Sequence, residues 1–542
     1  MIVRRRPGHL AALLAAFALP LLVGFHAIAP GQASTGQRLA IFAPGKLPYF
    51  SYGELVSLSK EQPLPKTTQD KLSTILNAAV LDNSAPNPPA PLQVTELGPT
   101  LRVAEWNIER GENFDWIVLA LKDEKGFRQK IKADNPKITP AQLDKIAGQA
   151  RDLSQASTLI LDEVDLGMNR SQYHDVARDL AAVLKMNFVF AVSFVEVDPL
   201  KLGTEELSDA DAGGDDELRT ELESALKADP RRYKGLHGSA ILSRYPISNV
   251  RVQHLPVCHD WFQGEISSVA KLEQAKRLAS DKIFLEKIER EVRRGGRIAI
   301  IADLKVKDAP GGVVTVVNAH LENKCPPACR RKQMRAILEG IGDVRNPLIL
   351  AGDMNTSGSD ASHLSLGYLV KSRATDYRFW GRTAIMMTTP LPSLYALNYY
   401  KNYTDPTVRD IKFLSDNKEA AFFGDIEKFR FADHGRFDVR GDKNRTVSGT
   451  GKRFSDSNQR NRKGFVATFS LPRDFKGFVG RFKLDWFFIK PAVEDGKTAE
   501  NLAPWYARTM VELNKAPVER ISDHAPITVD LPLTAKPKAR SE

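Results

Sequence analysis

Short apolar runs that end in polar residues recur along this chain between residues 101 and 533. Each run has the length and the content of β-branched residues that are typical of a β-strand. Helical spacing occurs between strands at residues 173–184 and 330–341. Because strands that alternate with helices form sheets covered by helices, the pattern predicts an α/β fold. The expected strands are residues 101–108, 158–163, 187–192, 239–243, 313–318 and 348–352.

Six polar motifs occur in order along the same region, most of them directly after an apolar run. Each motif alone is weak evidence, but together they predict one active site whose residues are scattered along the chain. The motifs are Trp106-Asn107-Ile108-Glu109, Asp162-Glu163-Val164, Asn318-Ala319-His320-Leu321, Gly352-Asp353-Met354-Asn355, Leu484-Asp485-Trp486 and Ser522-Asp523-His524-Ala525-Pro526.

The order of these motifs resembles the endonuclease/exonuclease/phosphatase superfamily, the metal-dependent phosphohydrolases that include deoxyribonuclease I. The resemblance implies a four-layer α/β/β/α sandwich of two packed mixed sheets, with the active site at one end and helical and loop insertions. It also implies in-line attack of water on phosphorus without a covalent enzyme intermediate. Other hydrolase and nucleotide-binding classes fit worse, because the chain has no Gly-x-Ser-x-Gly elbow, Walker loop or dinucleotide fingerprint.

Glu163 and Asp523 are the expected metal-binding carboxylates, and the side-chain amide of Asn107 is expected to assist them. Magnesium prefers oxygen donors and is usually held by one or two carboxylates together with substrate phosphate, with Mn²⁺ or Ca²⁺ as alternatives. Relatives often carry Gln before the metal-binding Glu, whereas this chain has Asp162. That difference changes the local charge without removing the ligand.

Asp485 and His524 are expected to form a catalytic dyad. A histidine works best as an acid or base when a carboxylate fixes its tautomer and stabilises the imidazolium. The resemblance places these two residues in such a dyad. A turn capped by aspartate is the structural alternative for the Asp-His-Ala-Pro string, but the upstream strand that begins near Leu484 favours the catalytic interpretation.

Asp353, Asn355 and His320 complete the expected catalytic set. Asp353 and Asn355 are two residues apart at a strand end, so their side chains are expected to point the same way. The resemblance implies that Asp353 positions or deprotonates the attacking water, or contacts a second metal. It further implies that Asn355 donates to a nonbridging oxygen and that His320 contacts the phosphate or protonates the leaving oxygen.

Two other histidines receive no catalytic role. His237 precedes Ser239, where relatives often carry Asn, so the sequence leaves a substrate contact at His237 in doubt. His434 falls in a variable insertion and is expected on the surface.

A formal net charge of +11 favours polyanionic partners such as nucleic acid or anionic lipid headgroups. A nuclease is the leading hypothesis. A sphingomyelinase- or phospholipase C-like phosphoesterase is the enzymatic alternative and would need exposed aromatic loops, for which Trp261-Phe262 is a candidate. An inactive, basic polyanion-binding protein is the third hypothesis, and the presence of every acid–base and metal position argues against it.

The first 33 residues have the features of an export signal. Arg4-Arg5-Arg6 precedes an apolar stretch at residues 10–25, and Gly31-Gln32-Ala33 provides a cleavage site before Ser34. The apolar stretch is interrupted by Pro20 and is shorter than the ~20 residues that span a bilayer. The mature chain is therefore expected to be exported, periplasmic or secreted, without a transmembrane span.

The remaining segments are organised around the expected catalytic domain at residues 99–535. Residues 34–98 are expected to form an N-terminal extension and a Pro-rich linker, and residues 536–542 a tail. Insertions are expected at about residues 115–155, 200–232, 265–296 and 375–480, the third containing a long charged helix at 268–294. The basic segment 436–463 is expected to be a mobile loop that either contacts phosphate backbone or only keeps the protein soluble.

Three cysteines cannot build a disulfide scaffold. Cys325 and Cys329 could close a small ring, or either could pair with Cys258, and the third thiol would stay free. A zinc site is less favoured, because Cys-x3-Cys lacks the four ligands of a structural zinc.

Overall fold

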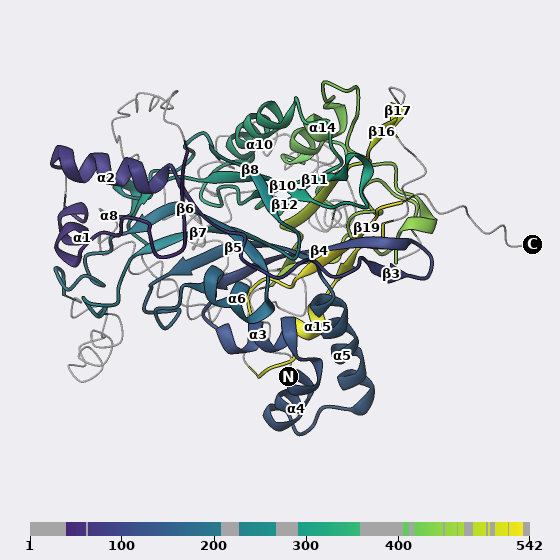
Figure 1. Cartoon of the computed structure of the whole chain (residues 1–542), viewed down its shortest axis with the longest axis horizontal. Coiled ribbons are helices and arrows are strands. Elements are labelled where there is room, and N and C mark those ends of the chain that lie inside the picture. The colour runs from purple at the N-terminus through teal and green to yellow at the C-terminus, as the bar shows by residue number, and fades with distance from the viewer. Residues whose placement is uncertain are drawn as a thin grey trace, which may run out of the picture. The chain divides into compact units, whose positions relative to one another are not determined.

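Two mixed β-sheets packed face to face form the centre of the computed structural model, with helices on their outer faces (Figure 1). The α/β/β/α sandwich expected from the sequence is confirmed. The expected signal peptide and the C-terminal tail lie outside the described residues. The structure describes residues 39–60, 63–206, 227–266, 291–357, 405–410, 417–447, 450–462, 464–470, 481–494, 497–498, 505–518 and 520–534.

The first sheet has the strand order β1-β2-β6-β7-β5-β4-β19-β18, with β3 paired to β4 and β9 paired to β6. Strand β4 lies parallel to β5 and antiparallel to β19, so segments from both ends of the chain meet at its centre. The strands are β1 (Ala40–Phe42), β2 (Ala78–Asp82), β3 (Leu92–Val94), β4 (Gly98–Arg110), β5 (Thr158–Leu166), β6 (Asn187–Glu196), β7 (Leu236–Ser243), β9 (Arg293–Gly295), β18 (Arg508–Thr509) and β19 (Ile527–Pro532).

The second sheet has the order β15-β12-β11-β10-β8, with only β11 and β12 parallel. Its inner face packs on the first sheet through β-branched and aliphatic side chains, such as Ile300 and Val316 against Ile160 and Ile241. The strands are β8 (Ile247–His254), β10 (Ile298–Lys305), β11 (Val313–Ala319), β12 (Leu348–Asp353) and β15 (Asp485–Lys490). All six strands expected from the sequence are confirmed.

Helices cover the outer face of each sheet (Figure 1). The helix expected from residue 173 begins at Val176, because the Asp175 side chain caps it by accepting the Arg178 N–H. On the first sheet lie α1 (Tyr52–Leu58), α2 (Lys66–Leu76), α3 (Phe114–Lys122), α4 (Glu124–Asp134), α5 (Pro140–Ser154), α6 (Val176–Leu184) and α15 (Val511–Asn514), and on the second lie α10 (Pro327–Ile341) and α14 (Ala420–Lys428).

The remaining described elements are short. They are α8 (Gln263–Ile266), the 3-10 turns η1 (Pro310–Gly312) and η3 (Lys443–Arg445), and the strand pairs β13 (Phe469–Ser470) with β14 (Arg481–Phe482) and β16 (Val493–Glu494) with β17 (Lys497–Thr498).

The N-terminal segment contributes to the first sheet. Strand β2 pairs with β6 from Ala79 to Asp82, and β3 pairs with β4. The proline-rich stretch expected as a linker therefore lies between two strands of the same sheet.

Two expectations about the insertions need correction. The charged helix expected at residues 268–294 lies mostly outside the described residues, and its last residues form strand β9, which pairs with the end of β6. The basic segment 436–463 is not a loose loop in its described part. Arg445 is buried between Asp438 and Asp456, and Phe454 belongs to the core beside β15. These buried contacts hold the segment against the second sheet despite its polar composition.

A disulfide joins Cys258, after β8, to Cys329 in the first turn of α10. Of the pairings that the sequence allowed, this is one of the two that use Cys258. Cys325 is buried and forms no disulfide.

Candidate active site

Positive φ values and β-bulges at the strand ends direct the side chains of the motifs toward a common site. Glu109, Glu163 and Asn355 have φ values of 46°, 51° and 50°, in the left-handed region that non-glycine residues rarely adopt. The pairing of β4 with β5 shifts register between Asn107 and Arg110, and the pairing of β5 with β7 shifts between Leu161 and Val164. Bulges of this kind change the direction of side chains and are common next to active sites. The left-handed backbone conformations are strained, and they persist only where the surrounding structure holds them.

His524 and Asp485 form the expected pair. The Nδ1 atom of His524 lies 2.9 and 3.0 Å from the two carboxylate oxygens of Asp485, and both side chains are buried. The indole N–H of Trp106 donates to the His524 carbonyl at 2.9 Å and fixes the backbone there. Burial alone would lower the pKa of His524, but Asp485, Asp523 and Asp353 raise it well above the ordinary value. The imidazole is therefore held as an imidazolium at neutral pH.

Asp353 lies between two histidines. Its Oδ2 atom is 3.6 Å from Nε2 of His320 and 3.7 Å from Nε2 of His524. Burial raises the pKa of Asp353 to about 8, opposed by His524 and reinforced by Asp485. Burial also lowers the pKa of His320 well below its ordinary value, so that His320 is neutral where His524 is charged.

Asp162 connects the two sheets beneath this group. Its Oδ2 atom accepts the backbone N–H of Asp353 at 2.8 Å, and its Oδ1 atom accepts the Ser239 hydroxyl at 3.1 Å. Burial raises the pKa of Asp162 to about 7. The aspartate that departs from the common pattern thus positions Asp353.

Asn355 lies beside Asp353, and one hydrogen of its side-chain amide is already engaged in a hydrogen bond within the protein. Its side-chain amide donates to the Leu321 carbonyl at 2.9 Å, and its backbone N–H donates to Asp353 Oδ1 at 2.9 Å. An amide nitrogen carries two hydrogens. One of them is used by Leu321, and only the other can reach a substrate oxygen.

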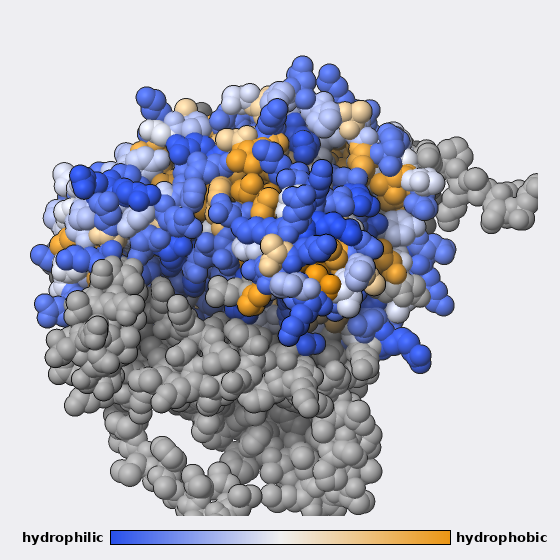
Figure 2. Space-filling model, turned by 90° about the horizontal axis from the view of Figure 1, so that it is seen from below, coloured by the Kyte–Doolittle hydropathy of each residue, from blue (hydrophilic) through white to orange (hydrophobic). Residues whose placement is uncertain are grey.

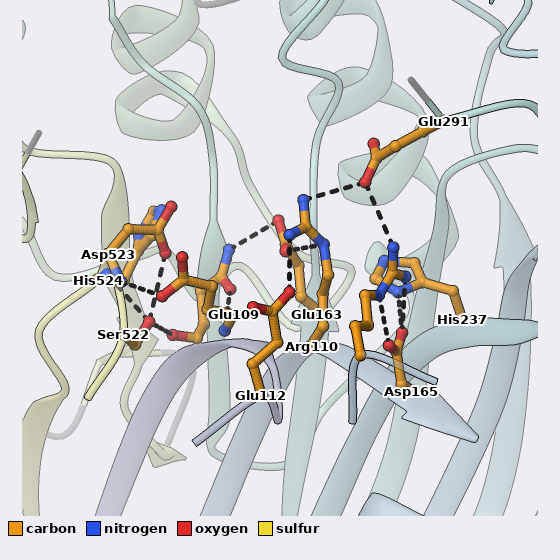
Figure 3. A network of polar contacts seen from close by, with 12 residues as sticks. Glu109, Arg110, Glu112, Glu163, Asp165, His237, Glu291, Ser522, Asp523 and His524 are labelled. Atoms are coloured by element: carbon orange, nitrogen blue, oxygen red, sulfur yellow. Dashed lines mark hydrogen bonds and ion pairs between the residues drawn. The ribbon is translucent and has the colours of Figure 1, made fainter. Parts of the chain in front are cut away.

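Oxygen donors from distant segments gather beside the dyad. The side-chain amide of Asn107 donates to Glu163 Oε1 and to Asp353 Oδ2, both at 3.3 Å, while its Oδ1 atom accepts the Glu109 N–H at 3.1 Å. The Glu109 carboxylate accepts the Asp523 N–H at 2.9 Å. Figure 3 shows these side chains in one row, from Asp523 and His524 past Glu109 to Glu163.

Glu109 was not assigned to the site from the sequence. Its only sequence signal was its place in the Trp106–Glu109 motif, because nothing local shows that it reaches Asp523. Burial and the neighbouring Asp523 raise the pKa of Glu109 to about 8. A cation would stabilise the ionised forms of two carboxylates that are close enough to raise one another's pKa.

The donor set therefore suits a hard divalent cation. Glu109, Glu163 and Asp523 offer carboxylates, Asn107 offers an amide oxygen, and these four residues could hold Mg²⁺ together with substrate phosphate. Among the described residues, Asp353, Asp485 and His524 form the group of histidine and acidic side chains whose ligand atoms all lie within 4.8 Å of one another, whereas Glu109, Glu163 and Asp523 do not come that close together. In the structure the His524 Nδ1 atom already pairs with Asp485, so the group of Asp353, Asp485 and His524 is satisfied without an ion.

A second histidine–aspartate pair continues the row beyond Glu163 (Figure 3). His237 lies opposite Asp165 across β7 and β5, with Nδ1 2.8 Å from Asp165 Oδ1. Arg170 donates to the same carboxylate at 2.7 Å and pairs with Glu196 at 3.0 Å. His237 thus makes a defined buried contact with Asp165, which depends on strand register and has no local sequence signal.

The free energy of unfolding is expected to fall in acid between about pH 4 and pH 2 because of this network. Burial would raise the pKa of Asp165, but Arg170 and His237 lower it to about 2, and Arg170 and Lys201 likewise bring Glu196 to about 2. A carboxyl whose folded pKa lies below its unfolded pKa stabilises the protein above about pH 4, and the stabilisation is lost as the pH falls.

Urea unfolding at steps from pH 6 to pH 2 measures this dependence. The wild type is expected to lose on the order of 2 kcal/mol per such carboxyl, and Asp165→Asn to show a shallower slope. Identical slopes for the two proteins would contradict the assignment.

Trp261 and Phe262 do not form the exposed aromatic loop that a lipid-directed enzyme would need. They are 3% and 4% exposed, and Trp261 Nε1 donates to buried Glu322 at 2.9 Å. His434 is exposed in a turn, as expected. On the coloured part of the face in Figure 2, most residues are hydrophilic and the hydrophobic ones lie in small groups.

Comparisons with known proteins identify a family that the chain matches over most of its length. The model of a family described as "Endonuclease/Exonuclease/phosphatase family" matches residues 105–524. No curated protein matches the chain.

Several solved structures are similar at low identity. An endonuclease/exonuclease/phosphatase from Beutenbergia cavernae is 16% identical over 81% of this chain and 73% of its own, with a TM-score of 0.35. A 3'-5' exonuclease from Neisseria meningitidis is 13% identical over 79% and 99%, with a TM-score of 0.34. The human Nocturnin catalytic domain with bound sulfate is 12% identical over 81% and 97%, with a TM-score of 0.34.

Proposed function

Because the chain belongs to the endonuclease/exonuclease/phosphatase family and is a hydrolase of phosphoester bonds, we propose that it is a magnesium-dependent nuclease. The observation that carries the proposal is the position of Asp353. Its carboxylate lies 3.6 and 3.7 Å from two histidine Nε2 atoms and accepts a hydrogen bond from the side-chain amide of Asn107, which also donates to Glu163. A proton acceptor beside groups that stabilise negative charge is an arrangement that promotes hydrolysis of a phosphodiester.

The proposed roles follow from charge and hydrogen bonding. Asp353 accepts a proton from the attacking water in its ionised form, which with a pKa of about 8 becomes the main form only as the pH rises through about 8. His524, kept protonated by Asp485, donates from Nε2 to the developing negative charge on phosphate. His320 is neutral and donates its ring N–H to the leaving oxygen, which takes up its proton from the imidazolium of His524 or from water.

Glu109, Glu163, Asp523 and Asn107 would hold the magnesium ion, which when bound polarises the phosphoryl oxygens. This set keeps the three metal residues expected from the sequence and adds Glu109. The free amide hydrogen of Asn355 faces a nonbridging oxygen in this arrangement.

Nucleic acid is the proposed substrate because the chain carries a net charge of +11 and because its candidate aromatic loop for lipid is buried. Export is proposed from the features of the first 33 residues and from the Cys258–Cys329 disulfide, which is stable in oxidising compartments. No helix in the described part of the chain is long and apolar enough to cross a membrane.

Nicking of supercoiled plasmid by the chain from Ser34 tests the proposal. We expect nicking with magnesium, none with chelator, and a loss of about 10²-fold or more in rate for Asp523→Asn. Asp425→Asn is the matched control, because Asp425 pairs with Arg331 and Arg335 on the outer helices. Absence of nicking by the wild type would contradict the nuclease proposal and direct the same assay to phospholipids and phosphomonoesters.

A further inference from the structure

A hollow of about 420 Å³ lies at the edge of the second sheet, beside the C-terminal end of α14. Residues 436–440 form part of its wall, and the backbone N–H of Asp438 donates to the Ile489 carbonyl of β15 at 2.8 Å. The catalytic residue Asp485 begins the same strand four residues earlier, about 13 Å away along the strand. The hollow is therefore separate from the candidate active site.

Five cationic and two acidic side chains line this hollow, which we call the basic hollow. The cationic residues are Lys428, Arg430, Arg436, Arg440 and Arg453. Both carboxylates are already paired. Asp438 accepts Arg440 at 2.6 and 3.0 Å and the buried Arg445 at 3.0 Å. Glu427 pairs with Arg453, so neither acidic side chain is left to neutralise the other cations.

The remaining cations, Lys428, Arg430 and Arg436, have no acidic partner among the described residues. Arg430 donates to the carbonyls of Glu427 at 3.2 Å and Phe429 at 2.8 Å. These bonds hold the guanidinium at the end of α14 without neutralising its charge. Since charges of one sign in a concave place add to a strong local potential, the basic hollow attracts anions.

Packing beneath the basic hollow holds the wall that carries Arg436. The neighbouring Phe437 is 1% exposed, and its ring centroid lies 5.2 Å from that of buried Phe431. The backbone N–H of Ala432 donates to the Gly342 carbonyl at the end of α10 at 2.8 Å. A wall that is already ordered lowers the entropy lost when a ligand binds.

The kind of ligand follows from what the basic hollow offers. Phe437 is the aromatic residue among the described ones that line it, and its ring is buried in the core. A nucleobase would therefore find no exposed ring on which to stack, whereas guanidinium and ammonium groups bind phosphate oxygens. The volume is at the lower end of the roughly 300–1,000 Å³ of small-ligand sites, which suits a ligand portion of nucleotide size.

We propose that the basic hollow binds the phosphate groups of a nucleotide or of a nucleic-acid strand, outside the catalytic site. Arg430 and Arg436 contact phosphate oxygens through planar N–H donors, and Lys428 adds a point charge. The inference goes beyond the proposed function, because these residues take no part in hydrolysis. It also assigns a ligand to part of the basic segment 436–463, for which the sequence left phosphate contact and solubility as alternatives.

Fluorescence anisotropy with a labelled single strand of about 12 nucleotides tests the proposal, in chelator so that the strand stays intact. The test variant combines Arg430→Gln with Arg436→Gln. The matched control combines Arg462→Gln with Lys122→Gln, which removes two exposed charges outside the hollow, one of them from the same basic segment. We expect about 10-fold weaker binding by the test variant, and a salt dependence of log K that is shallower by about 0.7 per lost contact.

A second titration identifies the source of the phosphate. The same proteins are titrated with a nucleoside monophosphate and with inorganic phosphate. Weaker binding of the monophosphate by the test variant assigns the hollow to a single nucleotide, and a loss confined to the strand assigns it to successive phosphates of a strand. Equal binding of all ligands by wild type and test variant, or the same loss in the control, would overturn the proposal.

Hydrolysis of bis-p-nitrophenyl phosphate, a diester with one phosphate, separates the basic hollow from the active site. We expect the test variant to keep kcat/KM within about twofold of the wild type, because its substitutions touch no reacting group. A loss equal to that of strand binding would overturn the assignment of a separate site. If the wild type hydrolyses no diester, the proposed nuclease function fails, while the anisotropy measurement still decides whether the hollow binds phosphate.

Discussion

Replacement of His524 by alanine is expected to lower kcat for phosphodiester hydrolysis by about 10²- to 10⁴-fold. The imidazolium is the one histidine in the site that Asp485 and its neighbours keep protonated, and its Nε2 atom faces Asp353 at 3.7 Å. Its removal deletes the positive charge nearest to the reacting phosphate. Steady-state kinetics on a chromogenic diester measures the effect, and His434→Ala, an exposed turn histidine, is the matched control.

Asp485→Asn tests the same dyad through the pH profile. The substitution keeps the shape of the side chain and removes the negative charge that raises the pKa of His524. Since His524 would then lose its proton at lower pH, the alkaline limb of the kcat profile is expected to move to lower pH. An unchanged alkaline limb, or wild-type kcat in His524→Ala, would contradict the proposed role.

Replacement of Asp530 by alanine is expected to lower the free energy of unfolding by about 3–5 kcal/mol. Asp530 is buried on β19 and accepts Arg102 of β4 at 2.6 and 2.9 Å and Arg508 at 2.9 Å. Removal of the carboxylate leaves the charge of Arg102, 3% exposed, without its main partner in the core. The substitution is also expected to lower activity. Asp530 and Arg102 join β19 to β4, and these two strands position the site residues His524 and Asn107.

Urea unfolding with a spectroscopic readout measures this prediction. Glu512→Ala is the control, because the pair of Glu512 with Lys145 is exposed and such pairs contribute about 1 kcal/mol or less. Similar unfolding midpoints for the wild type and Asp530→Ala would show that the buried pair does not hold the two ends of the chain together.

The strand and helix pattern was readable from the sequence because it depends on local periodicity. An apolar run such as residues 313–318 is stable only when it is buried, so it was predicted to be a strand of the core. The observed strand β11 is one residue longer than the predicted one. Errors occurred where distant contacts outweigh composition. The basic segment 436–463 has few apolar residues, yet Arg445 between Asp438 and Asp456 holds it against the core.

By itself, the sequence determined the α/β fold class and the order of the motif residues, because both follow from short strings along the chain. The pairing of His524 with Asp485 was predicted only through the resemblance of that order to a known family. The tertiary structure alone decided that Glu109 accepts the Asp523 N–H and that His237 pairs with Asp165. Each of those contacts depends on strand register and on bulges, where a shift of one residue turns a side chain to the opposite face.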